Sequence, residues 1–309
     1  MDKIVVIVGP TASGKTALSV ELAKLFNGEI ISADSMQIYR GMDIGTAKVT
    51  EEEKQGVVHH LIDIVDPSEE FSLADYLELA KKTAKDIISR GKIPFIVGGT
   101  GLYVSSFTDN IKLSPSKADP EYREFLNEYA KKNGTFALKQ LLRPIDPESY
   151  EKLYDNDVKR ISRALEIYRD SGKTVEEFNR ESKQDPEYEF LKFGLCCEDR
   201  EFLYSRINKR VDIMIEQGLL SEAKKIFESD RSGTARQAIG YRQLDGYFEG
   251  SMSLEDAVES IKQESRRYAK RQLTWFKRDK NIIWHNIDIK NSKEILNSCS
   301  KHMEKFLKV

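Results

Sequence analysis

Short apolar runs rich in β-branched residues recur through the first hundred residues. They occupy residues 4–8, 29–33 and 93–97, and the first reads Ile-Val-Val-Ile-Val. Runs of this length without alternating polar positions are typical of strands buried on both faces of a parallel sheet. Between the second and third runs, Ser72 is placed to cap a helix that we expect to end at about Ser89. Strands that alternate with helices predict an α/β core with right-handed crossovers.

The hydrophobic pattern changes near residue 113. Up to about residue 187 the chain is charged and helical in pattern, and it contains no convincing buried strand. Strand patterns return at 190–197 and 282–284. We therefore predict a first part of the core at 1–112, a helical insertion domain at 113–189, and a part that completes the core at 190–309. The turns of the insertion are marked by Pro115, Pro120, Pro144, Pro147 and Pro186.

Composition narrows the class of protein. Of 309 residues, 32% are charged, and no apolar run approaches the length of a membrane span. The first residues lack the basic region, long apolar stretch and cleavage site of an export signal. Three cysteines, two of them adjacent at Cys196 and Cys197, provide neither a disulfide framework nor a paired zinc spacing. We expect a cytoplasmic monomer that does not bind membranes.

The segment between the first strand and the next helix carries the strongest functional signal. It matches the pattern G-x-x-x-x-G-K-[ST] of a phosphate-binding loop (P-loop), in the strand-to-helix context that supports this reading. The glycines let backbone N–H groups turn toward phosphate oxygens, Lys15 adds a positive charge, and the Thr16 hydroxyl is placed to bind Mg²⁺. The predicted fold is an α/β P-loop parallel-sheet core with a helical insertion domain. The expected phosphate-binding residues are Gly9, Pro10, Thr11, Ala12, Ser13, Gly14, Lys15 and Thr16.

The loop predicts a bound diphosphate or triphosphate but does not identify the reaction. P-loops that transfer a γ-phosphoryl group need a Mg²⁺-binding carboxylate after a second apolar strand. The run at 93–97 ends instead in Gly-Gly-Thr-Gly, so that acid is missing there. Asp34 follows the run at 29–33, where it can bind Mg²⁺, accept a proton from a nucleophile, or simply cap a turn. Thr100 lies among the glycines, which either bring it close to the substrate or only make a tight turn.

Basic clusters point to a nucleic-acid partner, although the net charge of −2 argues against a uniformly basic surface. Between residues 264 and 280, seven basic residues accompany two acidic ones and form a stripe at helical spacing. We expect Trp275 and Phe276 to anchor this helix in the core, and stacking on RNA bases is the alternative. A solvated basic face is the alternative interpretation of the stripe. A second cluster consists of Lys159, Arg160 and Arg163.

Several longer motifs resemble those of the tRNA dimethylallyltransferase family in order and spacing, over nearly the whole chain. Some of these motifs are too long to match by chance. Besides the P-loop, they include Ser-Ala-Asp-Ser-Met-Gln-Ile-Tyr at 32–39, Gly-Thr-Ala-Lys at 45–48, His-His-Leu-Ile-Asp at 59–63, Gly-Gly-Thr-Gly-Leu-Tyr at 98–103, Asp-Val-Lys-Arg-Ile-Ser-Arg-Ala-Leu-Glu at 157–166, Ala-Ile-Gly-Tyr-Arg-Gln at 238–243 and Lys-Arg-Gln-Leu-Thr-Trp-Phe at 270–276.

The resemblance implies a Mg²⁺-dependent transfer of the dimethylallyl group from dimethylallyl diphosphate to N6 of adenine 37 in tRNAs that read codons starting with U. It also implies that the P-loop holds the diphosphate, that Asp34 takes the N6 proton, and that Thr100 borders the reaction channel. The insertion is expected to grip the anticodon stem-loop. The implied tRNA-binding residues are Asp34, Ser35, Met36, Gln37, Arg123, Lys159, Arg160, Ile161, Ser162, Arg163, Gly240, Tyr241 and Arg242.

Arg206 and Arg210 lie four residues apart on the helix expected after residue 200, and therefore on one face. Displacement of diphosphate builds negative charge on the leaving oxygens, which N–H groups, lysine, Mg²⁺ and arginines stabilise. We predict that Arg210 acts with Lys15 on the diphosphate and that Arg206 is a further diphosphate contact. Surface ion pairing with Asp212 and Glu216 is the alternative.

Three other functions remain open from the residues alone. A P-loop small-molecule kinase would transfer phosphate from ATP to a metabolite, but it would need neither the insertion nor the basic helix. A prenyltransferase acting on free adenine nucleotides would have no use for the insertion. A nucleotide-switched RNA-binding module would bind RNA without forming a covalent product.

Overall fold

The computed structural model describes residues 1–112, 119–229 and 234–308 of the chain. The chain folds into two compact units. Unit 1 comprises Met1–Thr108 and Glu187–Val309, and unit 2 comprises Asp109–Pro186. Unit 2 begins and ends a few residues before the predicted boundaries of the insertion, and the predicted boundary at residue 113 lies outside the described residues.

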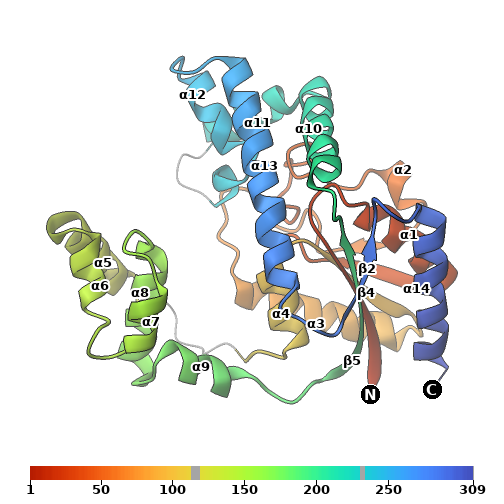
Figure 1. The fold of residues 1–309 in the computed structure, drawn as a ribbon, viewed down its shortest axis with the longest axis horizontal. Helices are drawn as coiled ribbons and strands as arrows, with labels where there is room; N and C mark the ends of the chain where they lie inside the picture. The colour runs from red at the N-terminus through yellow and green to blue at the C-terminus, as the bar shows by residue number, and fades with distance from the viewer. Residues whose placement is uncertain (113–118, 230–233, 309) are drawn as a thin grey trace. The chain divides into compact units, whose positions relative to one another are not determined.

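A parallel sheet of six strands forms the centre of unit 1 (Figure 1). The strand order is β3-β2-β4-β1-β5-β6, and every neighbouring pair is parallel. Ile4, Val5, Val6 and Ile7 in the central strand β1 have no exposed surface, because helices cover both faces. The predicted parallel α/β core is therefore confirmed. The strands are β1 (Asp2–Val8), β2 (Gly28–Ser32), β3 (His59–His60), β4 (Ile93–Gly98), β5 (Tyr188–Cys196) and β6 (Ile282–Asn286).

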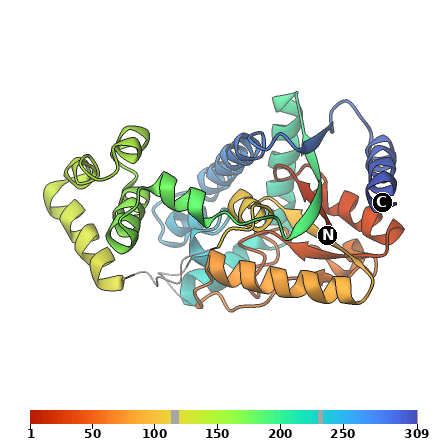
Figure 2. The ribbon, with the colours of Figure 1, turned by 90° about the horizontal axis from the view of Figure 1, so that it is seen from below.

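Helices cover both faces of the sheet (Figure 2). Helices α1 (Lys15–Leu25) and α14 (Ser292–Leu307) pack on one face. Helices α3 (Leu73–Ser89) and α4 (Gly101–Thr108) cover the other. Helix α3 has the predicted bounds, because the Ser72 hydroxyl accepts the Asp75 N–H and the Asp75 carboxylate accepts the Ser72 N–H.

A group of helices lies beyond the carboxyl ends of the strands (Figure 1). Apolar residues of α10, α11 and α13 share a core with Ile38, Tyr39 and Met42 from the segment after β2. This packing brings the second half of the chain over the end of β2. The elements of this part are α2 (Glu51–Lys54), α10 (Arg200–Glu216), α11 (Leu219–Ser229), α12 (Asp245–Phe248), α13 (Leu254–Phe276) and short 3₁₀ turns at Ala235–Gln237 and Arg242–Leu244.

Unit 2 is helical and has its own core. Leu126, Leu138 and Ile161 have no exposed surface and pack together at its centre. An isolated antiparallel bridge between Ile111 and Lys183 joins its two ends. In the parts of both units that the structure describes, no helix has the length and hydrophobicity needed to cross a membrane. The helices of unit 2 are α5 (Pro120–Asn133), α6 (Thr135–Gln140), α7 (Pro147–Lys152), α8 (Val158–Ser171) and α9 (Val175–Ser182).

Candidate active site

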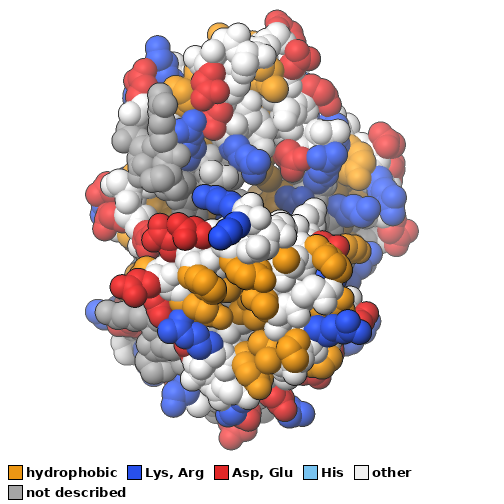
Figure 3. Space-filling model, turned by 90° about the vertical axis from the view of Figure 1, so that its left-hand side faces the viewer, with side chains coloured by type: hydrophobic (Ala, Val, Ile, Leu, Met, Phe, Trp, Pro, Cys, Tyr) orange, Lys and Arg blue, Asp and Glu red, His pale blue; other side chains and the backbone are white. Residues whose placement is uncertain are grey.

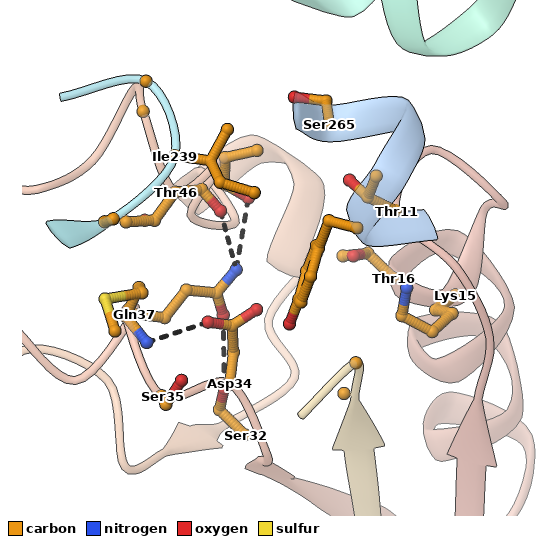
Figure 4. Close-up of a pocket in the computed structure, with 18 of the residues that line it drawn as sticks. Thr11, Lys15, Thr16, Ser32, Asp34, Ser35, Gln37, Thr46, Ile239 and Ser265 are labelled. Atoms are coloured by element: carbon orange, nitrogen blue, oxygen red, sulfur yellow. Dashed lines mark hydrogen bonds between the residues drawn. The ribbon is translucent and has the colours of Figure 1, made fainter. Parts of the chain in front are cut away.

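A cavity of about 360 Å³ opens at the carboxyl ends of β1, β2 and β4, in the position where parallel α/β sheets bind ligands. Its volume is in the range of small-molecule sites. Lining residues come from the P-loop and α1, the segment after β2, the end of β4, α10, α13 and the segment 237–240. Figure 4 shows Lys15 and Thr16 on one side of the cavity and Asp34, Gln37 and Thr46 on the other.

The P-loop connects β1 directly to α1. Gly9 and Gly14 have φ angles of 153° and 91°, and Ala12 also adopts positive φ, at 61°. A Cβ atom on Gly9 would lie 2.7 Å from the Leu195 carbonyl oxygen, so only glycine fits beside β5. Thr11, Lys15 and Thr16 line the cavity, while the other loop residues shape the backbone between them.

The Lys15 ammonium lies over the loop, where it donates a hydrogen bond to the Pro10 carbonyl at 2.8 Å. Burial, and to a smaller extent the neighbouring Arg210, lower the pKa of Lys15 to about 8, and Asp34 opposes both effects. Burial also lowers the pKa of Arg210. Two cations are thus held at one end of the cavity with little compensating charge. The positive charge at this end of the cavity favours the binding of an anion.

The two candidate arginines have different positions. Arg210 lines the cavity, and its Nη2 lies 3.5 Å from the Ala47 carbonyl oxygen. Arg206 is exposed, and its Nε donates to the Ala12 carbonyl at 2.9 Å, so it braces the P-loop from outside. Asp212 pairs with Lys262 rather than with either arginine. The geometry therefore favours Arg210 over Arg206 as a contact to a bound diphosphate.

Asp34 lies directly after β2 and has its carboxylate in the cavity lining (Figure 4). Its Oδ1 accepts the Met36 N–H at 2.9 Å, so the turn-capping interpretation is correct for one oxygen. Among the described residues, Asp34 has no ion-pair partner within 4.0 Å. The second oxygen remains suited to accept a proton.

The glycines after β4 permit close packing. A Cβ atom on Gly98 would lie 2.2 Å from the Ala33 carbonyl oxygen, and one on Gly99 would lie 2.0 Å from Nε2 of Gln272. Thr100 accepts the Ser35 N–H at 3.0 Å and is not among the residues that line the cavity. In this structure Thr100 holds the turn that contains Asp34 in place, whereas contact with the reacting atoms stays a prediction.

Helix α13 supplies uncharged cavity residues, which the prediction based on its basic residues did not include. Gln272 is 5% exposed, accepts the Thr11 N–H at 2.9 Å and donates to the Gly99 carbonyl at 3.0 Å, so it joins the P-loop to the end of β4. Tyr268 lines the cavity, and burial raises the pKa of its phenol to about 12. Ser265 also lines it. The signal available in the sequence was the spacing of these three uncharged residues at i, i+3 and i+7.

The basic stripe itself is partly neutralised. Arg266 contacts Asn208 and Glu259, and Arg267 pairs with Glu264. The anchoring prediction for the two aromatic residues is confirmed. Phe276 is buried, and Trp275 donates its indole N–H to the Ser105 hydroxyl at 2.8 Å.

The residues of unit 1 that are expected to bind tRNA lie in different environments. Ser35, Met36, Gln37 and Gly240 line the cavity, and Arg242 is exposed. The Tyr241 side chain is 2% exposed and its hydroxyl donates to Glu222, so in this structure its ring is not available to RNA, whereas contact through its backbone stays a prediction.

In unit 2 the candidates lie on α5 and α8. Ile161 and Ser162 are buried, so their side chains are not available for RNA, whereas Lys159 and Arg160 are exposed. Arg123 and Arg163 both pair with Glu166. Apolar side chains gather on an exposed face of this unit (Figure 3). The exposed large apolar residues in the part of this unit that the structure describes are Phe125, Phe136, Leu141 and Tyr154.

No group of three or more His, Cys, Asp or Glu side chains in the described parts of the chain is arranged to hold a metal ion. His59 contacts the Val57 carbonyl, whereas His60 contacts the Glu29 carboxylate, as expected for neighbours on a strand. Within the cavity, Thr16 and Asp34 offer oxygen ligands, which Mg²⁺ prefers together with substrate phosphates and water.

The chain is similar to a known family over most of its length. The IPP transferase family model matches residues 37–279, and the isopentenyl transferase model matches residues 2–65. The tRNA dimethylallyltransferase of Acetivibrio thermocellus is 50% identical over 297 residues, which cover 95% of each chain. That of Thermoanaerobacter sp. is 48% identical over 97% of each chain.

Solved structures show the same likeness. The tRNA isopentenylpyrophosphate transferase of Bacillus halodurans has a TM-score of 0.74 and 46% identity, and the match covers 99% of this chain and 98% of the other. A eukaryotic dimethylallyltransferase acting on tRNA has a TM-score of 0.82 and 30% identity, with 99% of this chain and 80% of the other covered. This chain therefore belongs to the IPP transferase family, in agreement with the resemblance of its motifs to those of the tRNA dimethylallyltransferases.

Proposed function

We propose that the protein transfers the dimethylallyl group from dimethylallyl diphosphate to N6 of adenine 37 in tRNAs that read codons starting with U, and releases diphosphate. It acts as a monomer in the cytoplasm. One observation carries the proposal. A single cavity joins the P-loop cation Lys15 to the carboxylate of Asp34, and β4 ends in glycine instead of the acid that phosphoryl transfer requires.

In the proposed reaction, N6 forms a bond to C1 of the dimethylallyl group while the bond between C1 and the diphosphate oxygen breaks. The diphosphate leaves with the electron pair of that bond, and N6 gives its proton to Asp34. Lys15 and Arg210 line the cavity and stabilise the charge that grows on the leaving oxygens. Asp34 has an oxygen suited to the proton, because only Oδ1 is held by the Met36 N–H.

The cavity lining also suits the hydrocarbon part of the donor. Its apolar members include Val49, Ile62, Val211, Met214 and Ile261. These side chains favour burial of the dimethylallyl group and exclude water, which would otherwise compete with N6 for the allylic carbon.

Mg²⁺ is proposed as the cofactor. When bound, it supplies a Lewis acid that neutralises charge on the leaving diphosphate. The Thr16 hydroxyl lines the cavity beside Lys15 and is the protein ligand that the P-loop pattern predicts.

The tRNA anticodon stem-loop is proposed as the acceptor. Adenine 37 must leave its stack to enter a cavity, which is the usual route by which enzymes modify a base. Unit 2 offers the exposed cations Lys159 and Arg160 and the exposed aromatic residues Phe125, Phe136 and Tyr154. Cations and aromatic rings together suit the phosphates and unstacked bases of a single-stranded loop.

The first test is incubation of the purified protein with Mg²⁺, dimethylallyl diphosphate and an unmodified tRNA that has adenines at positions 36 to 38, followed by nucleoside mass spectrometry. We expect a gain of one dimethylallyl group on adenine 37 alone. The same tRNA with guanine at position 37 should gain nothing, and free AMP should not be modified. Modification of AMP would favour the free-nucleotide prenyltransferase, and consumption of ATP on a metabolite without tRNA product would favour the kinase.

Donor binding should weaken as pH rises above about 8. The pKa of Lys15 is about 8 in the free protein, so above that pH the neutral amine must take up a proton before it can pair with diphosphate. The apparent donor KM should therefore be flat below pH 8 and rise by up to about tenfold per pH unit above it. Lys15→Arg should remove this rise, because arginine stays charged. A donor KM that is constant to pH 9.5 in the wild type would contradict this role.

A further inference from the structure

The motifs at 45–48 and 238–243 both contact the side chain of Glu222, which belongs to neither motif. Glu222 lies in the first turn of α11 and is absent from the cavity lining. Its carboxylate accepts the backbone N–H groups of Asp43, Ile44 and Gly45 at 2.8, 2.9 and 2.8 Å. It also accepts the Tyr241 hydroxyl at 2.6 Å. Three successive N–H groups around a carboxylate form a strong anion nest, and four donors satisfy the oxygens of one carboxylate.

The loop packs so closely on Tyr241 that it requires glycine. A Cβ atom on Gly45 would lie 2.5 Å from the Tyr241 ring. Burial and the Glu222 carboxylate raise the pKa of Tyr241 far above its usual range, so its hydroxyl stays protonated and acts as a donor. At the other end of the loop, the Lys48 ammonium contacts the carboxylates of Asp43 and Asp63. The segment 43–48 is therefore held at both ends.

The opposite side of this loop holds a cavity residue. The Gln37 side-chain amide donates from Nε2 to the carbonyls of Thr46 and Ala47 at 3.2 and 3.3 Å. Its Oε1 accepts the Ser32 hydroxyl at 3.2 Å (Figure 4). These contacts fix which end of the amide points to the loop, and the two carbonyls belong to the segment whose first three N–H groups bind Glu222.

We propose that Glu222 is a positioning residue for the acceptor base, which acts through the loop 43–48 on Gln37. The proposal rests on the proposed function and on the expectation, implied by the family resemblance, that Gln37 binds the tRNA. Loss of the nest frees the loop carbonyls to turn, and the Gln37 amide then loses its fixed orientation. Donor binding is affected less, because the Lys15 ammonium is held by the Pro10 carbonyl within the P-loop itself and the contact of Arg210 with Ala47 is long, at 3.5 Å.

The test compares Glu222→Gln with the wild type in steady-state dimethylallyl transfer. Glutamine keeps the size of the side chain, but it carries no charge and presents an NH₂ group to a nest of donors. We expect kcat/KM for tRNA to fall by about tenfold or more and the donor KM to change by less than about twofold. The melting temperature should stay within about 4 °C of the wild type. Glu228→Gln, an exposed site on the same helix, is the matched control and should leave all parameters unchanged.

A double-mutant cycle separates positioning from a purely structural role. If Glu222 acts through Gln37, Glu222→Gln should cost little more when Gln37→Ala is already present. Fully additive losses in kcat/KM would overturn the proposal.

Tyr241→Phe is a second test. It keeps the ring that packs on Gly45 and removes the hydroxyl that donates to Glu222, so it should lower kcat/KM for tRNA by about twofold to fivefold without unfolding the chain. If Glu222→Gln does not fold, an unchanged kcat/KM in Tyr241→Phe overturns the proposal instead. Absence of product with the wild type would refute the proposed function itself, whereas a wild-type product with a normal Glu222→Gln variant would refute only the role of Glu222.

Discussion

Asp34→Asn is expected to abolish most dimethylallyl transfer while tRNA remains bound. Asparagine keeps an oxygen that can accept the Met36 N–H, so the turn after β2 is preserved. It cannot accept the proton that N6 releases in the proposed reaction. Loss of a positioned general base costs about 10²- to 10⁴-fold in rate, and we expect kcat to fall within that range.

Single-turnover kinetics at saturating tRNA and donor measure this loss, and gel-shift titration measures the affinity for tRNA. Asp86→Asn on α3, outside the cavity lining, is the matched control. A kcat within threefold of the wild type would remove Asp34 from the proton transfer. A loss of tRNA affinity as large as the loss of rate would make Asp34 a binding residue instead.

Lys15→Met is expected to produce the second large effect, in donor affinity and rate together. Methionine retains much of the side-chain length but loses the charge that lies over the P-loop. In the proposed reaction the ammonium stabilises a diphosphate whose negative charge grows as the bond to carbon breaks, so its removal should weaken the transition state more than the ground state. We expect kcat/KM for dimethylallyl diphosphate to fall by about 10²- to 10³-fold.

The measurement is transfer at varied donor concentration, with direct titration of diphosphate binding as a second readout. Lys24→Met provides a control on the same helix, since Lys24 is not a cavity residue and pairs with Glu21 at the surface. If donor KM and kcat both stay at wild-type values in Lys15→Met, the P-loop does not hold the diphosphate. A change in tRNA affinity alone would assign Lys15 to the acceptor.

Local pattern was sufficient for most of the fold. The apolar runs predicted β1, β2 and β4, and the capping residue Ser72 placed the start of α3 correctly. These features depend on neighbours within a few positions, such as the capping box that Ser72 forms with Asp75. The P-loop belongs to the same class, because its geometry follows from glycine spacing between a strand and a helix.

The basic stripe shows where local pattern stops being informative. The charge count predicts an RNA-facing stripe on α13, which stays a prediction, and two members of the stripe, Arg266 and Arg267, are paired within unit 1. The same helix supplies Tyr268 and Gln272 to the cavity. A helix presents several faces, and its sequence alone does not say which neighbour each face will meet.

The sequence by itself determined the α/β core, the P-loop with Lys15, the carboxylate of Asp34 at a strand end, and the family to which the motifs belong. Only the tertiary structure decided that Arg210 faces the cavity while Arg206 braces the loop, that Tyr241 is buried, and that Glu222 clamps the loop behind Gln37. The physical reason is the separation along the sequence between the residues that make the deciding contacts. Strands, caps and glycine loops are set by contacts within a few residues, whereas these roles depend on contacts between residues far apart in the sequence, such as Glu222 with Gly45.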